Sequence, residues 1–374
     1  MPKLLFLVTE DWYFYSHRLP LAREAQRNGY SVVVATRVQE HGQRILAEGF
    51  KLIPIGMQRR SKNPFRELSA LIELIRVYKS ERPDIVHNIA IKPVIYGSLA
   101  ALFARVPRVI NAIAGMGYVF TSKSIRAKSL RPFIKLALKF LLNRSTTRTI
   151  FQNPDDQNML VQEGIVRRER TMLIRGSGVD PQTYLPTPEP TGLVTIVLAS
   201  RMVWDKGIKE FVEAARMLKA DRINARFVLV GDTDHGNFAA VPTAQLEIWN
   251  KSGIVEWWGK RDDMPRIFAA SHIVCLPSAY GEGIPKVLIE AASCGRPIVT
   301  TDAPGCREIV RNNENGLLVP VRDHVALARA LRMLIDDSSL RTQMGARGRE
   351  LVLKEFTIEK VVGETVSLYK SLFP

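Results

Sequence analysis

The amino-acid sequence predicts an α/β protein with two doubly wound, Rossmann-like parallel-sheet domains that face each other across a cleft. Apolar runs of strand length alternate with helix-compatible segments along the whole chain, which is the pattern of βαβ units. A proline-rich stretch at residues 180–192 interrupts the alternation once, after which it starts again. With 374 residues, the chain is long enough for two domains that each bury a core.

Ten apolar runs are predicted to be buried strands. In the first half they are Leu4–Val8, Ser31–Ala35, Ile85–His87, Val109–Ala112 and Thr149–Phe151. In the second half they are Thr195–Ala199, Arg226–Val230, Ile254–Trp257, Ile273–Leu276 and Pro297–Thr300. Helices are expected between them, among others at Leu19–Asn28, Pro64–Ser80, Val94–Phe103 and Ile208–Leu218.

The end of the chain and the proline-rich stretch set the expected domain limits. Phe356–Phe373 has apolar residues at helical spacing and is predicted to be an amphipathic closing helix. Residues 180–192, with four prolines, are predicted to be the interdomain linker. We therefore expect a first domain at residues 1–186 with the closing helix 356–374, and a second domain at residues 187–355.

Cysteine content and hydropathy exclude several protein classes. The three cysteines, Cys275, Cys294 and Cys306, exclude a disulfide scaffold and make a zinc site unexpected. The first apolar run is soon followed by Glu10 and Asp11, so we interpret it as a buried strand and not as a signal peptide. No stretch of 18 apolar residues is present, so no transmembrane helix is expected. These features predict a soluble protein of a reducing, cytoplasmic compartment.

The positive charge is concentrated in the first half. Residues 1–186 contain 29 Lys and Arg against 14 Asp and Glu, whereas residues 187–374 contain 24 against 23. Between Asp84 and Asp155 there are eleven basic residues and no acidic one. Such an asymmetry indicates an anionic partner of the first domain, which can be a membrane surface, an anionic substrate or nucleic acid.

Residues 277–297 contain the largest group of candidate binding residues in the sequence. A predicted strand ends near Leu276, and a loop with Gly281 and Gly283 leads to a helix whose first residue we expect to be Pro285. Backbone N–H groups at such a helix start favour a phosphate. Two carboxylates, Glu282 and Glu290, accompany this site and can accept hydrogen bonds from sugar hydroxyls; alternatively, they are solvated residues of an ordinary turn.

A second group of candidate binding residues follows the first strand of the second half. Arg201 and Lys206 lie in the segment Ser200-Arg-Met-Val-Trp-Asp-Lys-Gly207, between a predicted strand and a predicted helix. Ligands of parallel sheets bind at this edge, and two cations there can stabilise the charge of a leaving diphosphate. Each group alone is a weak signal, because a surface charge pair has the same appearance. Together they are specific.

The sequence resembles the retaining glycosyltransferases of family 4, which have the GT-B fold. The resemblance rests on Ser200-Arg-x4-Lys-Gly, Phe227-Val-Leu-Val-Gly-Asp232, Trp258-Gly259, Leu276-Pro-Ser, Glu282-x7-Glu290, Gly295-x-Pro-Ile-Val and Asn315-Gly-Leu-Leu-Val. In the first half, Ser16-His-Arg-Leu-Pro, Pro83-Asp-Ile-Val-His, Gly115-Met-Gly-Tyr-Val-Phe and Gly178-Val-Asp180 are similar to the branch that acts on polyprenyl-diphosphate-linked sugars. The resemblance also implies that the closing helix returns to the N-terminal domain.

The resemblance implies a role for each matching residue. Arg201 and Lys206 bind the nucleotide diphosphate, Glu282 accepts from the donor sugar and Glu290 accepts from the ribose. Gly283 and Ile284 complete these contacts, and the loop of Gly259, Lys260 and Arg261 borders the base. The donor is expected to be a UDP-sugar, with no cofactor and no obligatory metal. No protein nucleophile is required, and the leaving diphosphate can take the acceptor proton.

The acceptor side departs from the family pattern. Many relatives have His-Gly after the strand that matches Val109–Ala112, whereas this chain has Ile113-Ala-Gly115. His17 and His87, expected on loops of the first half, and the glycines Gly115 and Gly117 remain as acceptor-side candidates. The aromatic segment Asp11–His17 is expected to be a loop that stacks on an acceptor sugar or packs under the sheet. Asp232-Thr-Asp234 is interpreted as a loop and not as a metal site.

Residues 122–148 combine basic and apolar side chains. This cationic amphipathic segment suits an anionic membrane surface, although an ordinary helix with a solvated basic face has the same composition. Its candidate membrane patch consists of Lys123, Arg126, Lys128, Arg131, Lys135 and Lys139. The leading hypothesis is a transferase with a lipid-linked acceptor, peripheral on the inner face of the plasma membrane. The alternatives are a family 4 transferase with a soluble acceptor and a basic nucleic-acid-binding protein, for which no binding motif is present.

Overall fold

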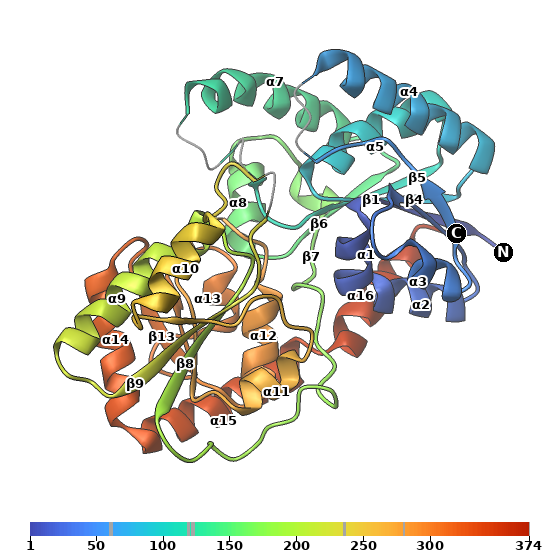
Figure 1. Cartoon of the computed structure of the whole chain (residues 1–374). Helices are drawn as coiled ribbons and strands as arrows, with labels where there is room; N and C mark the ends of the chain where they lie inside the picture. The colour runs from blue at the N-terminus through green and yellow to red at the C-terminus, as the bar shows by residue number, and fades with distance from the viewer. Residues whose placement is uncertain (60–62, 118–119, 121–123, 235–236, 280, 374) are drawn as a thin grey trace. The chain divides into compact units, whose positions relative to one another are not determined.

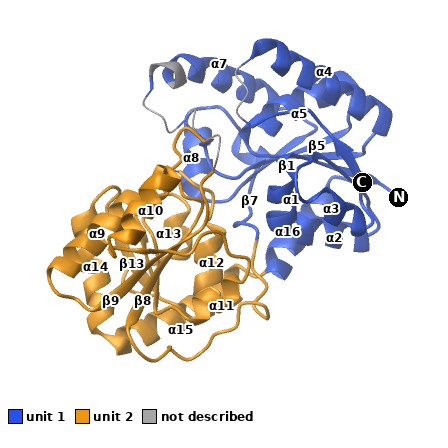
Figure 2. Ribbon diagram, in the orientation of Figure 1, with its two compact units in different colours: residues 1–177, 358–374 blue, residues 178–357 orange. Residues whose placement is uncertain are grey.

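The structure is a computed structural model that describes residues 1–59, 63–117, 120, 124–234, 237–279 and 281–373 (Figure 1). The chain divides into two compact units, residues 1–177 with 358–374 and residues 178–357 (Figure 2). Each unit contains a parallel sheet covered by helices on both faces, as predicted. The last helix, α16 (Ile358–Ser371), belongs to unit 1 and packs on α2.

Unit 1 contains a seven-stranded sheet with the order β3-β2-β1-β4-β5-β6-β7. Its strands are β1 (Lys3–Glu10), β2 (Ser31–Arg37), β3 (Lys51–Pro54), β4 (Ile85–Ile89), β5 (Arg108–Ile113), β6 (Thr147–Phe151) and β7 (Thr171–Leu173). The helices are α1 (Asp11–His17), α2 (Leu19–Arg27), α3 (Gly42–Ala47), α4 (Pro64–Glu81), α5 (Ile91–Ala104), α7 (Ile125–Leu142) and α8 (Pro154–Gln162), with a 3-10 turn η1 (Arg168–Arg170). The central strands are buried on both faces, which explains their continuous apolar runs.

Unit 2 contains a six-stranded sheet with the order β10-β9-β8-β11-β12-β13. Its strands are β8 (Val194–Ala199), β9 (Ala225–Val230), β10 (Glu256–Trp257), β11 (Ile273–Leu276), β12 (Ile298–Thr301) and β13 (Gly316–Val319). The helices are η2 (Trp204–Lys206), α9 (Ile208–Ala220), α10 (Thr243–Lys251), α11 (Met264–Ala269), α12 (Lys286–Ser293), α13 (Cys306–Ile309), α14 (His324–Asp336) and α15 (Ser338–Glu355). The three cysteines are buried free thiols.

The stretch predicted as the interdomain linker is part of unit 2. The Val179 N–H donates to the Phe356 carbonyl, and Arg349 donates to the carbonyls of Pro181 and Tyr184. The compact units therefore divide between Ser177 and Gly178 and again between Thr357 and Ile358. The expected limits of 186 and 355 lie inside the segments that these hydrogen bonds attach to unit 2.

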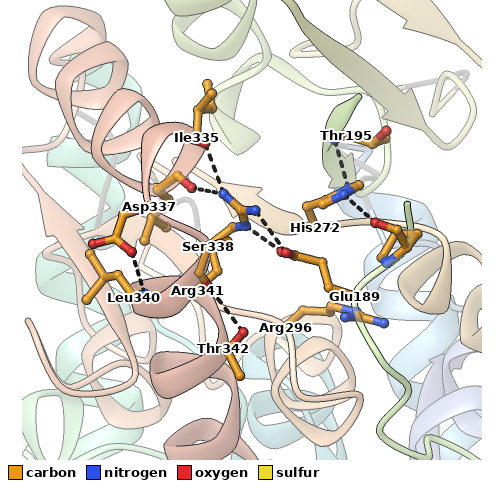
Figure 3. A network of polar contacts seen from close by, with 12 residues as sticks. Glu189, Thr195, His272, Arg296, Ile335, Asp337, Ser338, Leu340, Arg341 and Thr342 are labelled. Atoms are coloured by element: carbon orange, nitrogen blue, oxygen red, sulfur yellow. Dashed lines mark hydrogen bonds and ion pairs between the residues drawn. The ribbon is translucent and has the colours of Figure 1, made fainter. Parts of the chain in front are cut away.

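Buried polar side chains hold the following residues, 187–190, against the body of unit 2 (Figure 3). Arg341 pairs through two N–H groups with Glu189 and donates to the carbonyls of Leu334 and Ile335 at the end of α14. Arg296 donates to Thr187 Oγ1 at 2.6 Å. The His272 ring accepts from the Thr195 N–H at 3.0 Å and contacts the Pro190 carbonyl at 3.0 Å, and burial lowers its pKa.

Replacement of Arg341 tests this attachment. Arg341→Ala leaves the Glu189 carboxylate and two α14 carbonyls without their partner, which we expect to cost about 2–4 kcal/mol of the stability of unit 2. Four of the five tryptophans, Trp204, Trp249, Trp257 and Trp258, lie in this unit, so tryptophan fluorescence during urea unfolding reports on it. The surface pair of Arg332 and Asp336 provides the control, since Arg332→Ala should cost no more than about 0.5 kcal/mol. Equal unfolding midpoints of the two variants would contradict the account.

Candidate functional site

The predicted donor-site residues meet at the carboxyl edge of the unit 2 sheet. The chain order reverses between the adjacent strands β8 and β11, and ligands of such sheets bind outside the carboxyl ends of strands at this switch point. Arg201 and Lys206 follow β8, and Glu282 follows β11. The fold therefore brings together residues that are about eighty positions apart in the sequence.

The Lys206 ammonium and the Glu282 carboxylate form the centre of this site. Lys206 Nζ lies 2.5 Å from Glu282 Oε1 and 2.6 Å from Oε2, and both side chains are mostly buried. The hydroxyl of Ser278, which is fully buried, donates to the same Oε1 at 2.7 Å. Three donor contacts thus fix the orientation of one carboxylate.

A glycine allows the two loops to approach closely enough for this pair. Gly207, the N-cap of α9, has a φ of 75°, and a Cβ atom there would lie 2.1 Å from the Pro277 carbonyl oxygen. Any other residue would push the β8 loop away from the β11 loop, because a real Cβ does not come so close to backbone. The contact between Lys206 and Glu282 depends on this approach.

The electrostatic surroundings keep Glu282 ionised. Burial acts to raise its pKa, but the charge of Lys206 and the hydrogen bonds from Lys206 and Ser278 outweigh burial and hold the pKa below its usual range. A carboxylate with such a pKa is a hydrogen-bond acceptor at neutral pH and cannot serve as a general acid. An ionised Glu282 can therefore accept hydrogen bonds from the hydroxyl groups of a ligand.

Arg201 is paired with an acidic residue from the loop that follows the neighbouring strand, β9. Its Nη1 contacts Asp234 Oδ2, and both side chains remain partly exposed. Gly231, at the end of β9, makes this possible, since a Cβ there would lie 1.8 Å from the Ser200 carbonyl oxygen. The aspartate and the guanidinium therefore meet where the β8 and β9 loops touch.

Glu290 lies on α12 and is buried. Burial raises its pKa, against the opposing effects of Lys286, whose Nζ lies 3.5 Å from Oε1, and of Tyr184. Pro285 was expected to be the first residue of this helix, but the structure places it at the N-cap, and α12 begins one position later, at Lys286. Gly283 and Ile284 directly precede this helix and are buried.

The loop predicted to border the base lies beside β9. The Gly259 carbonyl accepts from the Gly231 N–H at 2.8 Å, which connects this loop to the one that carries Asp234. Lys260 is exposed, and Arg261 forms a two-point ion pair with Asp263 at the surface. Contact of these residues with a base remains a prediction.

The acceptor-side candidates lie in unit 1. Asp11–His17 forms α1 and not a loop, and the buried Asp11 side chain accepts from the Trp12 N–H and from the N–H groups of Gln39 and His41. Phe14 of this helix is buried in the core. The rings of Tyr13 and His17 stack, with their centroids 4.3 Å apart. Gly115 and Gly117 follow β5 with positive φ angles.

The expectation that His87 lies on a loop is wrong. His87 is in the middle of β4, which continues to Ile89, and its side chain is fully buried. Its Nδ1 lies 2.6 Å from the Tyr369 hydroxyl of α16. Burial and then the charge of Arg18 lower its pKa, so this histidine is a neutral core residue and is not accessible to an acceptor.

Three residues of interest carried no predicted role. Ser278 was quoted only as part of a motif, and Asp234 was interpreted only as loop, because their partners Glu282 and Arg201 become visible only in the fold. Ala90 follows β4 at the switch point of the unit 1 sheet and has φ 77° and ψ 158°, a strained conformation for a residue with a side chain. Nothing in an alanine signals such strain in advance.

Most of the predicted membrane patch lies on α7. Lys128 and Lys139 are exposed, Arg131 is half-buried, and Lys135 Nζ pairs with Glu163 at 2.8 Å. Arg126 lies in the first turn of α7, and Lys123 lies outside the described residues. Within the described ranges, no helix is both long and apolar enough to cross a bilayer. In the same ranges, no group of three or more potential His, Cys, Asp or Glu metal ligands occurs.

Comparison with known proteins supports the resemblance in both units. Residues 186–351 match the sequence model described as "Glycosyl transferases group 1", and residues 3–153 match that described as "Glycosyl transferase 4-like". An N,N'-diacetylbacillosaminyl-diphospho-undecaprenol alpha-1,3-N-acetylgalactosaminyltransferase of Campylobacter jejuni is 29% identical over 91% of both chains. A UDP-Gal:alpha-D-GlcNAc-diphosphoundecaprenol alpha-1,3-galactosyltransferase of Escherichia coli is 28% identical over 83% of this chain and 81% of its own.

Solved structures agree on the fold. Anabaena Alr3699/HepE in complex with UDP and glucose superimposes with a TM-score of 0.79 at 19% identity, over 99% of this chain and all of the other. WaaG, a glycosyltransferase involved in lipopolysaccharide biosynthesis, gives a TM-score of 0.73 at 17% identity, over 98% of this chain and 99% of the other. With two sheets of this topology and a matching domain in each half, the chain belongs to the GT-B glycosyltransferases, as an enzyme with a 4-like N-terminal domain and a group 1 C-terminal domain.

Proposed function

We propose that the enzyme transfers a hexose or N-acetylhexose from a UDP-sugar to an undecaprenyl-diphosphate-linked saccharide during bacterial glycan assembly. The proposal rests on the ion pair of Lys206 and Glu282 beside Arg201 at the unit 2 switch point. The site combines cations, which can bind a diphosphate, with a carboxylate, which can accept hydrogen bonds from sugar hydroxyls. The two undecaprenol-dependent relatives supply the acceptor class.

The charges of the site indicate which part of the donor each residue binds. Arg201 and Lys206 stabilise the negative charge that develops on the leaving diphosphate, which is the largest catalytic contribution expected here. Glu282, held ionised and oriented, accepts from hydroxyls of the donor sugar. Glu290 accepts from the ribose, and its raised pKa predicts weaker donor binding in acid solution.

We further propose that the reaction retains the anomeric configuration and needs no metal. Glu282 is already engaged by Lys206 and Ser278, which suits a binding role better than that of a free nucleophile. The cations can balance the diphosphate charge, and the departing phosphate oxygen can take the acceptor proton. Asp232 and Asp234 accept from protein groups, namely the Thr233 N–H and Arg201.

A lipid-linked acceptor requires the enzyme to work at a membrane surface, and we propose that α7 binds there. Four apolar side chains on one side of α7 are more than half exposed: Leu130, Phe133, Leu136 and Phe140. Lys128 and Lys139 flank this stripe. An exposed apolar stripe next to basic residues is typical of helices that lie in the lipid interface.

Helix α4 extends the proposed membrane surface. Both α4 and α7 pack on α5, over one face of the unit 1 sheet (Figure 1). The first half of α4 exposes Phe65, Leu68 and Ile72, which lie at helical spacing, and Phe65 is 81% exposed. Two helices of one layer therefore carry large apolar side chains that no described part of the chain covers.

Replacement of the donor-site residues tests the assignment. Arg201→Ala and Glu282→Gln should each lower kcat by at least a hundredfold, since they remove charge stabilisation and a sugar contact. The release of nucleoside diphosphate measures turnover, and the unfolding midpoint shows whether the fold is intact. Arg226→Ala, which removes a surface ion pair with Glu256 on the same sheet, is the matched control and should keep full activity. Normal turnover of a folded Arg201 or Glu282 variant would refute the site.

A substrate panel tests the function as a whole. The purified enzyme is incubated in detergent with nucleotide sugars and with either polyprenyl-diphosphate sugars or free sugars, with and without EDTA. We expect nucleoside diphosphate release only with a UDP-sugar and a lipid-linked acceptor, and no loss with EDTA. Release with free sugars would indicate the soluble-acceptor alternative, and loss with EDTA would overturn the metal-independent mechanism.

Vesicle binding tests the membrane surface. We expect Phe133→Ser with Leu136→Ser to weaken binding to vesicles containing anionic lipid by roughly tenfold or more at any salt concentration. Lys128→Gln with Lys139→Gln should weaken it by a similar factor, since each charge contributes about 1 kcal/mol. This loss should occur mainly at low salt, because salt screens the attraction between charges. Ile248→Ser with Met333→Ser, at exposed positions of unit 2, is the control. Unchanged vesicle binding, or tighter binding to duplex DNA than to vesicles, would contradict the proposal.

A further inference from the structure

The guanidinium of Arg201 is paired with a carboxylate of its own chain. Its Nη1 contacts Asp234 Oδ2, and the same carboxylate oxygen accepts from Asn237 Nδ2 at 3.1 Å. Neither Arg201 nor Asp234 is buried deeply enough to require this pair for folding. Lys206 is paired with Glu282 at the same edge of the sheet. Two carboxylates therefore balance the two cations that the proposed function assigns to the diphosphate.

Backbone hydrogen bonds hold the loop that carries Asp234 against the Arg201 segment. The Met202 N–H donates to the Asp232 carbonyl at 2.9 Å, and the Trp204 N–H donates to the Ala239 carbonyl at 2.8 Å. The Val241 N–H donates to the Met202 carbonyl at 2.9 Å. These contacts lie on both sides of Asp234, so the loop cannot leave without breaking them, and removing the carboxylate from Arg201 requires only a change of the Asp234 side-chain rotamer.

We propose that Asp234 is an intramolecular competitor of the donor diphosphate. This inference rests on the proposed function, in which Arg201 binds that diphosphate. The Asp234 carboxylate takes the place of a phosphate oxygen on Arg201 in the donor-free enzyme, and the nucleotide displaces it. Because the loop stays attached, the displaced carboxylate remains close to the diphosphate and repels it. Asp234 thereby weakens the binding of both the donor and the nucleoside diphosphate product, which favours product release.

The neighbouring aspartate of the same loop provides a matched control. Asp232 is exposed, and its Oδ1 accepts from the N–H of the next residue, Thr233, at 2.7 Å. It has the same formal charge as Asp234 and lies only two positions away, but the described contacts do not pair it with Arg201. An effect specific to Asp234 therefore cannot come from the net charge of the loop.

Binding of UDP tests the inference, because it needs neither a sugar nor an acceptor. We measure UDP affinity by titration calorimetry with the full-length enzyme and with the variants Asp234→Asn, Asp234→Ser and Asp232→Asn. We expect both Asp234 variants to bind UDP roughly tenfold more tightly, with a similar decrease in the KM for the donor and no increase in kcat. Asp232→Asn should bind UDP as the unaltered enzyme does.

The possible outcomes separate this inference from the proposed function. Equal or weaker UDP binding by the Asp234 variants, with normal binding by the unaltered enzyme, would overturn the competitor role alone and would indicate that Asp234 orients Arg201. If UDP binding depended on a divalent cation and Asp234→Asn abolished it, Asp234 would be a metal ligand and the inference would fail. No UDP binding by the unaltered enzyme would overturn both the donor assignment and this inference. Local damage to the fold does not produce tighter binding, so a gain in affinity is specific.

Discussion

The close packing of two loops at the carboxyl ends of β8 and β11 is the constraint on which the donor site depends. Gly207 lets the β8 loop rest on the Pro277 carbonyl, and this approach places the Lys206 ammonium on the Glu282 carboxylate. Either charge alone in this mostly buried position would be costly, and the pair makes the burial acceptable. The Ser278 hydroxyl donates to the same carboxylate. The protein's own contacts therefore order these side chains, which reduces the cost of ordering them on ligand binding.

The rest of unit 2 supports this edge from a distance. Residues 178–190 are attached to the unit by Arg349, Arg296, Arg341 and His272, and in the same stretch Tyr184 interacts with Glu290 of α12. A proline-rich composition predicts a linker, and these prolines do lie near the passage between the units. Composition cannot reveal that arginines from other parts of unit 2 would bind such a segment. The attachment is a property of tertiary structure.

The sequence predicted the central strands well, whereas of the four strands at the sheet edges it predicted only β10. Strands such as β1, β4 and β8 are buried on both faces, so an unbroken apolar run identifies them. The strands β3 and β7 at the sheet edges are short and partly exposed, and their sequences carry no such run. Arg201, Lys206 and Glu282 were found because they form spaced motifs next to predictable strands. Asp234 as the partner of Arg201, the burial of His87 and the helical form of Asp11–His17 depend on contacts between distant segments, which no local pattern contains.

In the proposed mechanism the cations bind the diphosphate and Glu282 binds the donor sugar. Comparing the binding of UDP with that of a UDP-sugar tests these two roles most directly. The measurement is the affinity of Glu282→Gln and of the unaltered enzyme for both ligands, with the UDP-sugar that the enzyme accepts. If these roles are correct, the variant binds UDP at least as tightly as the unaltered enzyme, because Lys206 loses a competing carboxylate, and it loses the additional affinity that the sugar contributes. An equal loss of affinity for UDP and for the UDP-sugar would contradict the account and would place Glu282 on the nucleotide or make it purely structural.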